Sequence, residues 1–450
     1  MSKKRVLLIS YQFPPFAGTG VFRVLNFVEH LPAQGWDPVV LSVQPDHYEK
    51  GTSIDNGLCA RVNDLRCVYK TKCFQVFEFV IGLRGQFWHS VSVARASQVG
   101  TGMLTKPTRK GFWKRIKDLV TLAHRIPDKH VGWIPYGITA GFHICRHEKP
   151  DVIYASGGPW TSFLIGLALK SHFHLPLVID FRDPWVDNPY DELNVGLRRR
   201  VNRFLERRCL RKADVIIANT DPLRTVLAGK VACKHKCHTI TNGYNENEYI
   251  GLSPQKNDCD STVVTHVGSL YGKRTPDSFL MALVRLIDKG CLAPHEVTVR
   301  FVGHVDEARI HNVIGIHPLR SSIICSGVLP KGEALKALFQ SDIALLIQPD
   351  TQLQVPAKLF EYIRSQKPIL AVCGEGATQD LIEAHGLGVV ANTDDPQGME
   401  RAILAVIQQT RSRERIVKKD YQQFEAGALT AQLAGVLDSL YQSSQQTKNG

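Results

Sequence analysis

The sequence predicts an α/β protein built from two Rossmann-like, doubly wound domains. Short continuous apolar runs alternate with helical periodicity along most of the 450 residues, and such runs indicate parallel strands buried on both faces. The runs are too many for one ordinary sheet, and a polar, turn-rich stretch over residues 245–261 divides them into two sets. We therefore expect an N-terminal domain over residues 1–248, a C-terminal domain over residues 260–430, and a C-terminal helix with a frayed tail over residues 431–450.

The expected strands follow the apolar runs in chain order. They are Val6–Ser10, Val39–Val43, Val152–Ala155, Leu177–Asp180, Val215–Ala218, His238–Ile240, Val263–Val267, Val297–Val302, Ile323–Ser326, Ile343–Ile347 and Ile369–Val372. The loop after each strand then lies at the carboxyl edge of its sheet, which is where open parallel sheets bind their ligands.

The net charge of +13 comes from two short segments rather than from the whole chain. Residues 106–129 hold eight Lys or Arg against two Asp, and residues 198–212 hold eight against one Glu. These two segments account for the entire excess, so the rest of the chain is neutral. This distribution excludes a uniformly basic nucleic-acid binder. The apolar content of 44% excludes wholesale disorder.

The chain has the features of a cytoplasmic protein. The apolar run Val6–Ile9 is too short for a signal peptide, and no run approaches the roughly 18 apolar residues of a membrane span. The eleven cysteines have no framework spacing, which is typical of a reducing compartment. Residues Cys233–His238 resemble half of a metal site without a second half, so we favour a surface loop and expect neither a metal nor a cofactor.

Glycines or charged residues follow three strands of the N-terminal half, where they would face a ligand. The candidates are Gly18, Gly20, Gly157, Gly158, Arg182 and Asp183. Glycines there let a ligand approach the backbone at a helix N-terminus. The first loop is not a dinucleotide fingerprint, because Arg23 occupies the third glycine position and no acid ends the second strand. The alternatives are a plain strand-to-helix turn and a pairing of Arg182 with Asp183 at the sheet edge.

Cations mark two loops of the C-terminal half. Lys273 and Arg274 precede one expected helix, and Lys358 lies in the first turn of another, which Pro356 opens. A cation is unfavourable in a first helical turn unless an anion is bound there, so the pattern indicates a diphosphate site. Glu361 lies on the same helical face as Lys358 and can accept two hydrogen bonds from a ribose diol. The alternatives are a solvated basic turn and a Lys–Glu surface pair.

The order and spacing of these motifs resemble the GT-B glycosyltransferases of the retaining family 4, or group 1, type. The resemblance extends from Val6 to about Leu440 and is greatest to members found in bacterial exopolysaccharide and cell-surface polysaccharide clusters. The motifs that carry it are Pro14-Pro15 with Gly20 and Arg23, Pro127-Asp128, Gly132-Trp133, Pro150-Asp151, Ser156–Pro159, Asp180–Trp185, Ala213-Asp214, Asn242–Tyr244, His266–Tyr271 with Arg274, Phe301–Gly303, Gly327-Val328, Pro356–Tyr362 and Lys367-Pro368.

The resemblance implies that the C-terminal domain holds a nucleotide-diphospho-sugar donor. The implied donor-binding residues are Gly268, Lys273, Arg274, Gly327, Val328, Gln354, Val355, Pro356, Lys358 and Glu361. The implied acceptor-binding residues are Gly18, Gly20, Gly157, Gly158, Arg182 and Asp183, and the implied catalytic residues are Asp183, Arg274 and Lys358. Glu361 matches the second acid of the family's Glu-x7-Glu pattern. Leu353 replaces the first acid, so the sugar hydroxyl needs another partner, such as Gln352 or Gln354.

The implied activity is metal-independent hexosyl transfer with retention of configuration, to a glycan acceptor that we expect to be lipid-linked, in surface polysaccharide biosynthesis. The two domains would face each other across a cleft. Two alternatives remain from the sequence. One is a GT-B enzyme similar to a nucleotide-sugar 2-epimerase, and the other is a non-catalytic sugar-nucleotide-binding subunit, which the replacement at Leu353 suggests.

The two basic segments also suggest a peripheral location on the anionic inner face of the cell membrane. A helix over residues 112–124 would have an apolar stripe bordered by Lys110, Lys114, Arg115 and Lys117, and its docking on lipid and its packing on protein are equally compatible with that pattern. The helix over residues 197–212 repeats the pattern, with a stripe formed by Leu197, Val201, Phe204, Leu205 and Cys209. Packing of that stripe on its own domain is favoured, since the next strand follows at once.

Overall fold

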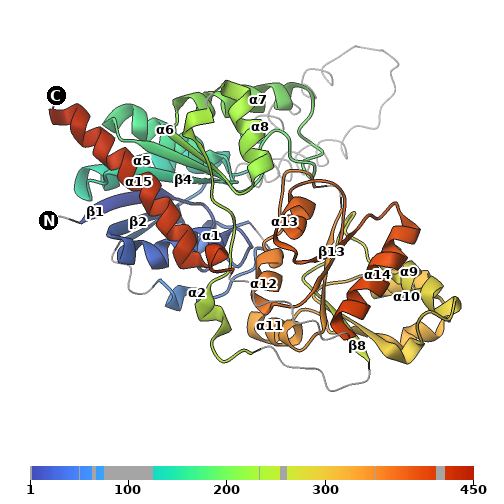
Figure 1. The fold of residues 1–450 in the computed structure, drawn as a ribbon. Coiled ribbons are helices and arrows are strands. Elements are labelled where there is room, and N and C mark those ends of the chain that lie inside the picture. Colours follow the sequence, from blue (N-terminus) through green and yellow to red (C-terminus); the bar gives the residue numbers. More distant parts are fainter. Residues whose placement is uncertain are drawn as a thin grey trace, which may run out of the picture. The chain divides into compact units, whose positions relative to one another are not determined.

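The computed structural model describes residues 3–49, 51–62, 67–75, 125–232, 234–253, 261–349, 351–411 and 421–449. The helix expected at residues 112–124 and most of the basic segment 106–129 lie outside these ranges. The described chain packs as two compact units, which we call the first and second domains (Figure 1). The first domain contains residues 1–218, 227–238 and 433–450, and the second contains residues 219–226 and 239–432.

The first domain contains a seven-stranded sheet in the order β3-β2-β1-β4-β5-β6-β7. Its strands are β1 (Lys4–Ile9), β2 (Trp36–Val43), β3 (Val68–Thr71), β4 (Val152–Gly157), β5 (Leu177–Phe181), β6 (Val215–Ala218) and β7 (Cys237–Thr239). The pairings from β3 to β6 are all parallel. Its helices are α1 (Val21–His30), α2 (Gly57–Ala60), α5 (Ile134–His147), α6 (Thr161–Phe173) and α7 (Gly196–Lys212), with α8 (Asp221–Val231) and α15 (Ala426–Asn449) belonging to it in part.

The second domain contains a six-stranded parallel sheet in the order β10-β9-β8-β11-β12-β13. Its strands are β8 (Thr262–Val267), β9 (Val297–Val302), β10 (Ile323–Cys325), β11 (Ile343–Gln348), β12 (Ile369–Cys373) and β13 (Gly388–Ala391). Its helices are α9 (Asp277–Asp288), α10 (Glu307–Ile314), α11 (Lys331–Phe339), α12 (Lys358–Ser365), α13 (Ala377–His385) and α14 (Pro396–Arg411). Two doubly wound Rossmann-like domains are therefore confirmed.

Each sheet reverses its strand order at one place, between β1 and β4 in the first domain and between β8 and β11 in the second. Helices leave opposite faces of the sheet on the two sides of such a reversal, so the strand ends there form a crevice in which α/β proteins bind ligands. The central strands are apolar and buried on both faces, as the sequence predicts.

All eleven predicted strands are present, with boundaries that shift by at most a few residues. The sequence prediction missed β3 and β13, which are both edge strands. An edge strand has one neighbour and buries less surface, so it needs no long apolar run. The four residues of β3 are all half-buried, and β13 begins with Gly388, which weakened its pattern.

The C-terminal segment contains the helix that the sequence predicts, and this helix extends over residues that were expected to form a frayed tail. The helix α15 continues to Asn449 and lies beside the N-terminal strands (Figure 1). Leu433 and Leu437 are fully buried, and Asp438 accepts a hydrogen bond from the indole Nε1 of Trp36 at 2.9 Å. Contacts with residues distant in the sequence therefore stabilise this end of the chain, which local composition does not reveal.

The helix α7 also differs from the prediction, because its apolar stripe does not form its buried face. Leu197 and Phe204 are 55% and 63% exposed, while Asn202 and Glu206 are buried. Only Cys209 of the predicted stripe is fully buried. Among the described residues, no helix is both long and apolar enough to cross a membrane.

Candidate functional site

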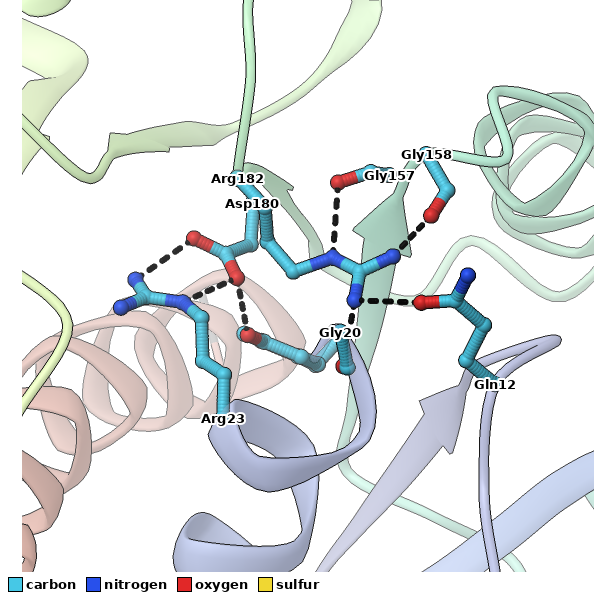
Figure 2. A network of polar contacts seen from close by, with 8 residues as sticks. Gln12, Gly20, Arg23, Gly157, Gly158, Asp180 and Arg182 are labelled. Carbon is cyan, nitrogen blue, oxygen red and sulfur yellow. Dashed lines mark hydrogen bonds and ion pairs between the residues drawn. The ribbon is translucent and has the colours of Figure 1, made fainter. Parts of the chain in front are cut away.

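The carboxyl ends of β1, β4 and β5 meet around the side chain of Arg182 (Figure 2). Its Nε donates to the carbonyl oxygen of Gly157 at 3.1 Å, and its Nη2 donates to the carbonyl oxygen of Gly158. Its Nη1 donates to Oε1 of Gln12 at 2.9 Å and to the carbonyl oxygen of Gly20. The structure thus joins residues of three predicted loops, and it assigns Arg182 to holding those loops together rather than to a pair with Asp183 alone.

The Gly20 position requires glycine because of this guanidinium. A Cβ at Gly20 would lie 1.8 Å from Nη1 of Arg182 and 1.8 Å from Oε1 of Gln12. We expect Gly20→Ala to lower the free energy of unfolding by about 1–3 kcal/mol, because the side chains must leave their hydrogen-bonded positions. Urea unfolding would measure this. The matched control is Gly229→Ala, which meets nothing within 4 Å and should be neutral or stabilising. Equal stabilities of the two variants would contradict the assignment.

A second buried network lies beside the first and includes Arg23, to which the sequence assigned no site role. Nε and Nη2 of Arg23 donate to the two carboxylate oxygens of Asp180 at 2.7 and 2.8 Å (Figure 2). The hydroxyl of Tyr154 donates to Oδ2 of Asp180 at 2.5 Å. Burial disfavours the charged form of Arg23, but the carboxylate of Asp180 raises its pKa above the ordinary range. Arg23 therefore ties α1 to β5 instead of occupying a phosphate-binding loop.

The two other predicted acceptor residues lie nearby in the chain but outside this network. The side chain of Asp183 is exposed, immediately after Arg182. Burial lowers the pKa of Arg182, and the charge of Asp183 opposes that shift. A Cβ at Gly18 would meet the ring of Phe16 at 2.3 Å, so this glycine serves close packing within its own loop.

Aromatic stacking fixes the loop that carries Asp183. The rings of Trp185 and Trp160 stack with their centroids 5.1 Å apart and their planes 6° apart. Trp185 is 2% exposed. This stacking fixes the loop after β5 and holds the Asp183 backbone next to the β4 loop.

In the second domain, a cation lies against a neutral histidine at the start of α12. Nδ1 of His266 lies 2.9 Å from the carbonyl oxygen of Leu345, and its Nε2 lies 3.3 Å from Nζ of Lys358. A carbonyl oxygen only accepts, so Nδ1 carries the proton and Nε2 accepts a hydrogen bond from the ammonium group. Burial, and then the charge of Lys358, hold the pKa of His266 well below its usual range. The ring is therefore neutral and positions the lysine.

Lys358 is the first residue of α12, as the resemblance implies for a donor-binding cation. Burial, and then the charge of Arg274, lower its pKa to about 8, while the charge of Glu361 opposes the shift. The turn after β8 passes close to the ammonium group, because a Cβ at Gly268 would lie 2.6 Å from Nζ. Gly268 also has a φ of +119°, which disfavours any other residue. Pro356 lies two residues before the helix, and its carbonyl accepts from the N–H of Leu359 at 3.0 Å.

The remaining predicted donor residues lie in loops of the same domain. Lys273 is exposed, and the guanidinium of Arg274 lies 5.2 Å from the ring centre of Tyr271. Gly327 has a φ of +66°, and its carbonyl accepts from the N–H of Gly303 at 2.7 Å. Three further residues have a mixed environment: Val328 is 76% exposed, while Gln354 and Val355 are buried.

Glu361 lies next to a cation that the sequence analysis did not name. Its Oε1 is 3.6 Å from Nζ of Lys331, which also contacts Glu248 at 2.6 Å. Burial raises the pKa of Glu361, and the charge of Lys331 opposes that shift. Burial therefore disfavours the ionised form of Glu361, and the positive charge of Lys331 offsets part of this effect.

Three residues of these networks were not among the predicted site residues, namely Tyr154, His266 and Lys331, although His266 begins a motif that carries the family resemblance. Tyr154 and His266 are polar residues inside otherwise apolar strands, which is the signal that could have found them. Lys331 gives no such signal, since it is an exposed residue at the start of α11. Among the described residues, no group of three or more His, Cys, Asp or Glu side chains has the arrangement of a metal site.

Comparison with known families decides the class. The model of the glycosyl transferase 4-like domain matches residues 18–243, half of the chain. The chain belongs to the glycosyl transferase 4-like family. This membership confirms the sequence resemblance and the expected glycosyltransferase class. No curated protein matches the chain.

Solved structures show that this glycosyl transferase 4-like protein has the GT-B fold over its whole length. The Anabaena protein HepE in complex with UDP matches with a TM-score of 0.57 at 14% identity, over 99% of both chains. Sucrose-phosphate synthase from Thermosynechococcus elongatus matches with a TM-score of 0.56 at 14% identity, over 99% of this chain and 98% of the other. A putative UDP-N-acetylglucosamine 2-epimerase from Listeria monocytogenes matches with a TM-score of 0.55 at 12% identity, over 98% of both chains.

Proposed function

We propose that this protein is a metal-independent, retaining hexosyltransferase that takes its sugar from a nucleotide-diphospho-sugar bound by the second domain. The observation that carries the proposal is the ammonium group of Lys358 at the first position of α12, held by His266 and covered by Gly268. A partly buried cation at the positive end of a helix dipole is a site for an anion. HepE, which has the same fold, is described in complex with UDP and with UDP-glucose.

The proposed chemistry follows from the charge that develops on the leaving group. As the bond between the anomeric carbon and the diphosphate breaks, negative charge grows on the phosphate oxygens. Lys358, Arg274 and the positive end of the α12 dipole would stabilise that charge, and fixed charges and dipoles of this kind contribute most of the catalysis in many enzymes. Glu361 would accept hydrogen bonds from the ribose hydroxyls, with Lys331 holding its charge.

The first domain would bind the acceptor, which we propose to be a lipid-linked glycan of surface polysaccharide biosynthesis. Arg182 directs donors at four oxygens of the loops after β1 and β4, so its role is to shape those loops. The exposed carboxylate of Asp183 follows it on a loop that Trp185 and Trp160 hold rigid. Asp183 is therefore our candidate for contacting the acceptor hydroxyl.

A donor panel tests the proposal. The purified protein is incubated with UDP-, GDP- and TDP-sugars, with and without a membrane extract, and nucleotide release and sugar products are measured. We expect donor-dependent product only with the extract, the same anomeric configuration in donor and product by proton NMR, and an unchanged rate in EDTA. Inversion of the configuration would contradict retention, and loss of activity in EDTA would contradict metal independence.

The main alternative is a nucleotide-sugar 2-epimerase, which the fold likeness to the Listeria monocytogenes protein favours. An epimerase needs no acceptor, so it would convert the donor to its epimer without the membrane extract. Binding of a nucleotide sugar with no turnover in either condition would instead indicate a non-catalytic subunit, in keeping with Leu353 at the first acid position.

Activity should fall at high pH because Lys358 loses its proton there. Burial lowers the pKa of Lys358 to about 8, so kcat/KM should fall about tenfold per pH unit above pH 8. A bound diphosphate favours the charged lysine, so the limb of kcat should lie at a higher pH than that of kcat/KM. The measurement is a pH–rate profile from about pH 6 to about pH 10, a range that extends roughly two units to either side of the shifted pKa. A flat profile across pH 8 would contradict the role of Lys358.

A further inference from the structure

The helix α7 buries Cys209 and Leu210 near its end, but over its first turns it exposes large apolar side chains and buries polar ones. Phe204 and Leu197 are 63% and 55% exposed, and the residues that lead into the helix, Val195 and Leu193, are 64% and 58% exposed. A helix packed only to complete its own domain normally has the opposite arrangement. The outward face of α7 therefore has an apolar surface that no element in the described part of the chain buries.

Specific pairings explain why the polar face is buried. Glu206 contacts Nζ of Lys230 at 2.6 Å, and Arg198 makes two hydrogen bonds of 2.9 Å with the carboxylate of Asp191. Asn202 donates to Asn194 at 3.1 Å. These bonds orient α7 by polar complementarity, so the exposure of Phe204 is a fixed consequence of the fold and not of a loosely held helix.

Six cations surround Phe204 on the same side of α7 and line a surface cavity of about 390 Å³ with it. They are Arg200, Arg203, Arg207, Arg208, Arg211 and Lys212. Among the described residues, no carboxylate forms an ion pair with any of these six, whereas Arg198 and Arg199 on other sides of the helix do have acidic partners. The outward face thus combines an apolar centre with uncompensated positive charge.

We propose that this outward face of α7 docks the protein on an anionic lipid bilayer. Arginines of this kind attract the headgroups, while exposed Phe and Leu side chains partition into the boundary between headgroups and acyl chains. A nucleic acid or a free phosphate would use the arginines but not the apolar residues at positions 193–204. The inference rests on the proposed function, since a lipid-linked acceptor lies at such a surface. It assigns the membrane contact to α7, although the sequence alone favours packing of this helix on its own domain.

The test is flotation of the full-length protein with vesicles of neutral phosphatidylcholine, alone or mixed with anionic phosphatidylglycerol. We expect binding only to the anionic vesicles, weakening as salt is raised. The variant Arg200→Gln/Arg207→Gln/Arg211→Gln should bind about a hundredfold more weakly, from roughly fivefold per arginine. Phe204→Ser should reduce binding about tenfold. The matched control is Arg320→Gln/Lys336→Gln/Arg401→Gln, which removes three exposed cations from the second domain and should bind normally.

Several outcomes would overturn the proposal. The first is vesicle binding that is unchanged in the α7 variants. If changing Lys110, Lys114, Arg115 and Lys117 to Gln abolished binding while the α7 variants bound normally, the contact would lie in that other basic segment. A fall in melting temperature on Phe204→Ser without loss of vesicle binding would show that the face is covered within the chain. Tighter binding to an oligonucleotide than to vesicles would show a different partner. Flotation needs no turnover, so a failed donor panel with intact vesicle binding would refute the proposed chemistry and leave the docking surface standing.

Discussion

Replacing Arg23 with methionine is expected to lower the free energy of unfolding of the first domain by about 3–5 kcal/mol. The variant removes the two hydrogen bonds from Arg23 to the fully buried carboxylate of Asp180, which keeps the hydrogen bond from Tyr154 and an electrostatic interaction with Arg182. A buried charge without its counter-ion keeps the whole cost of leaving water, and this cost exceeds the value of the hydrogen bonds themselves. Chemical unfolding, followed by the fluorescence of the buried tryptophans, would measure the change.

The matched control is Arg199→Met in the same domain. Arg199 contacts Asp187 at 3.5 Å with both side chains partly exposed, so its loss should cost less than about 1 kcal/mol. The double variant Arg23→Met/Asp180→Asn should be more stable than Arg23→Met, because it removes the buried carboxylate that has lost its two hydrogen bonds from Arg23. Equal effects of Arg23→Met and Arg199→Met would show that the Arg23–Asp180 pair does not stabilise the domain.

Replacing Lys358 with methionine is expected to lower kcat for sugar transfer by about 10²–10³-fold while leaving the second domain at least as stable. The loss of rate is what removal of one fixed charge donor usually costs. The stability follows from the pKa, which burial lowers from its usual 10.5 to about 8. A folded state that holds a proton less tightly than the unfolded state is destabilised below pH 8, and the penalty disappears as pH rises toward 10.5. Methionine removes that penalty.

Initial rates and melting temperatures at pH 7 would test both parts of this expectation. The control is Lys336→Met on α11, whose exposed side chain contacts Glu333 at 3.2 Å and should change neither quantity. A Lys358→Met variant with near-normal kcat would remove this residue from the chemistry. One that is inactive and unfolded would show a structural role instead.

The sequence was most informative where burial alone decides the structure. The central strands are continuous apolar runs because helices cover both faces of each sheet, so their existence and order could be predicted. The edge strands β3 and β13 bury less and gave no such signal. The C-terminal helix was predicted, but its contacts with Trp36 and Lys4 at the other end of the chain could not be read from local composition.

The candidate site was predicted in part for a related reason. The loops after β1, β4 and β5 meet because parallel strands end at one edge, and Gly20, Gly157 and Gly158 accordingly contact one guanidinium. Which side chains pair across those loops depends on three-dimensional distances. The roles of Arg23 and Asp180, which are 157 positions apart, could therefore not be read from local spacing.

The helix α7 shows the limit of periodicity most clearly. Its apolar residues recur at helical spacing, which normally marks a buried face. Here the buried face instead carries Asn202 and Glu206, because Asn194 and Lys230 supply their polar partners. A pattern of apolar residues predicts a face that avoids water, but it does not say whether protein or lipid covers that face.

The most direct test of the central claim, that Lys358 holds a nucleoside diphosphate in the second domain, is calorimetric titration with UDP, GDP and TDP. We expect at least one of them to bind the wild-type protein, with affinity about 10–100-fold lower for Lys358→Met. At about pH 8–9, which is close to the lowered pKa of Lys358, the protein should take up protons when the nucleotide binds, because the bound diphosphate raises that pKa. Equal affinity of the wild-type protein and the variant, with no proton uptake, would contradict the claim.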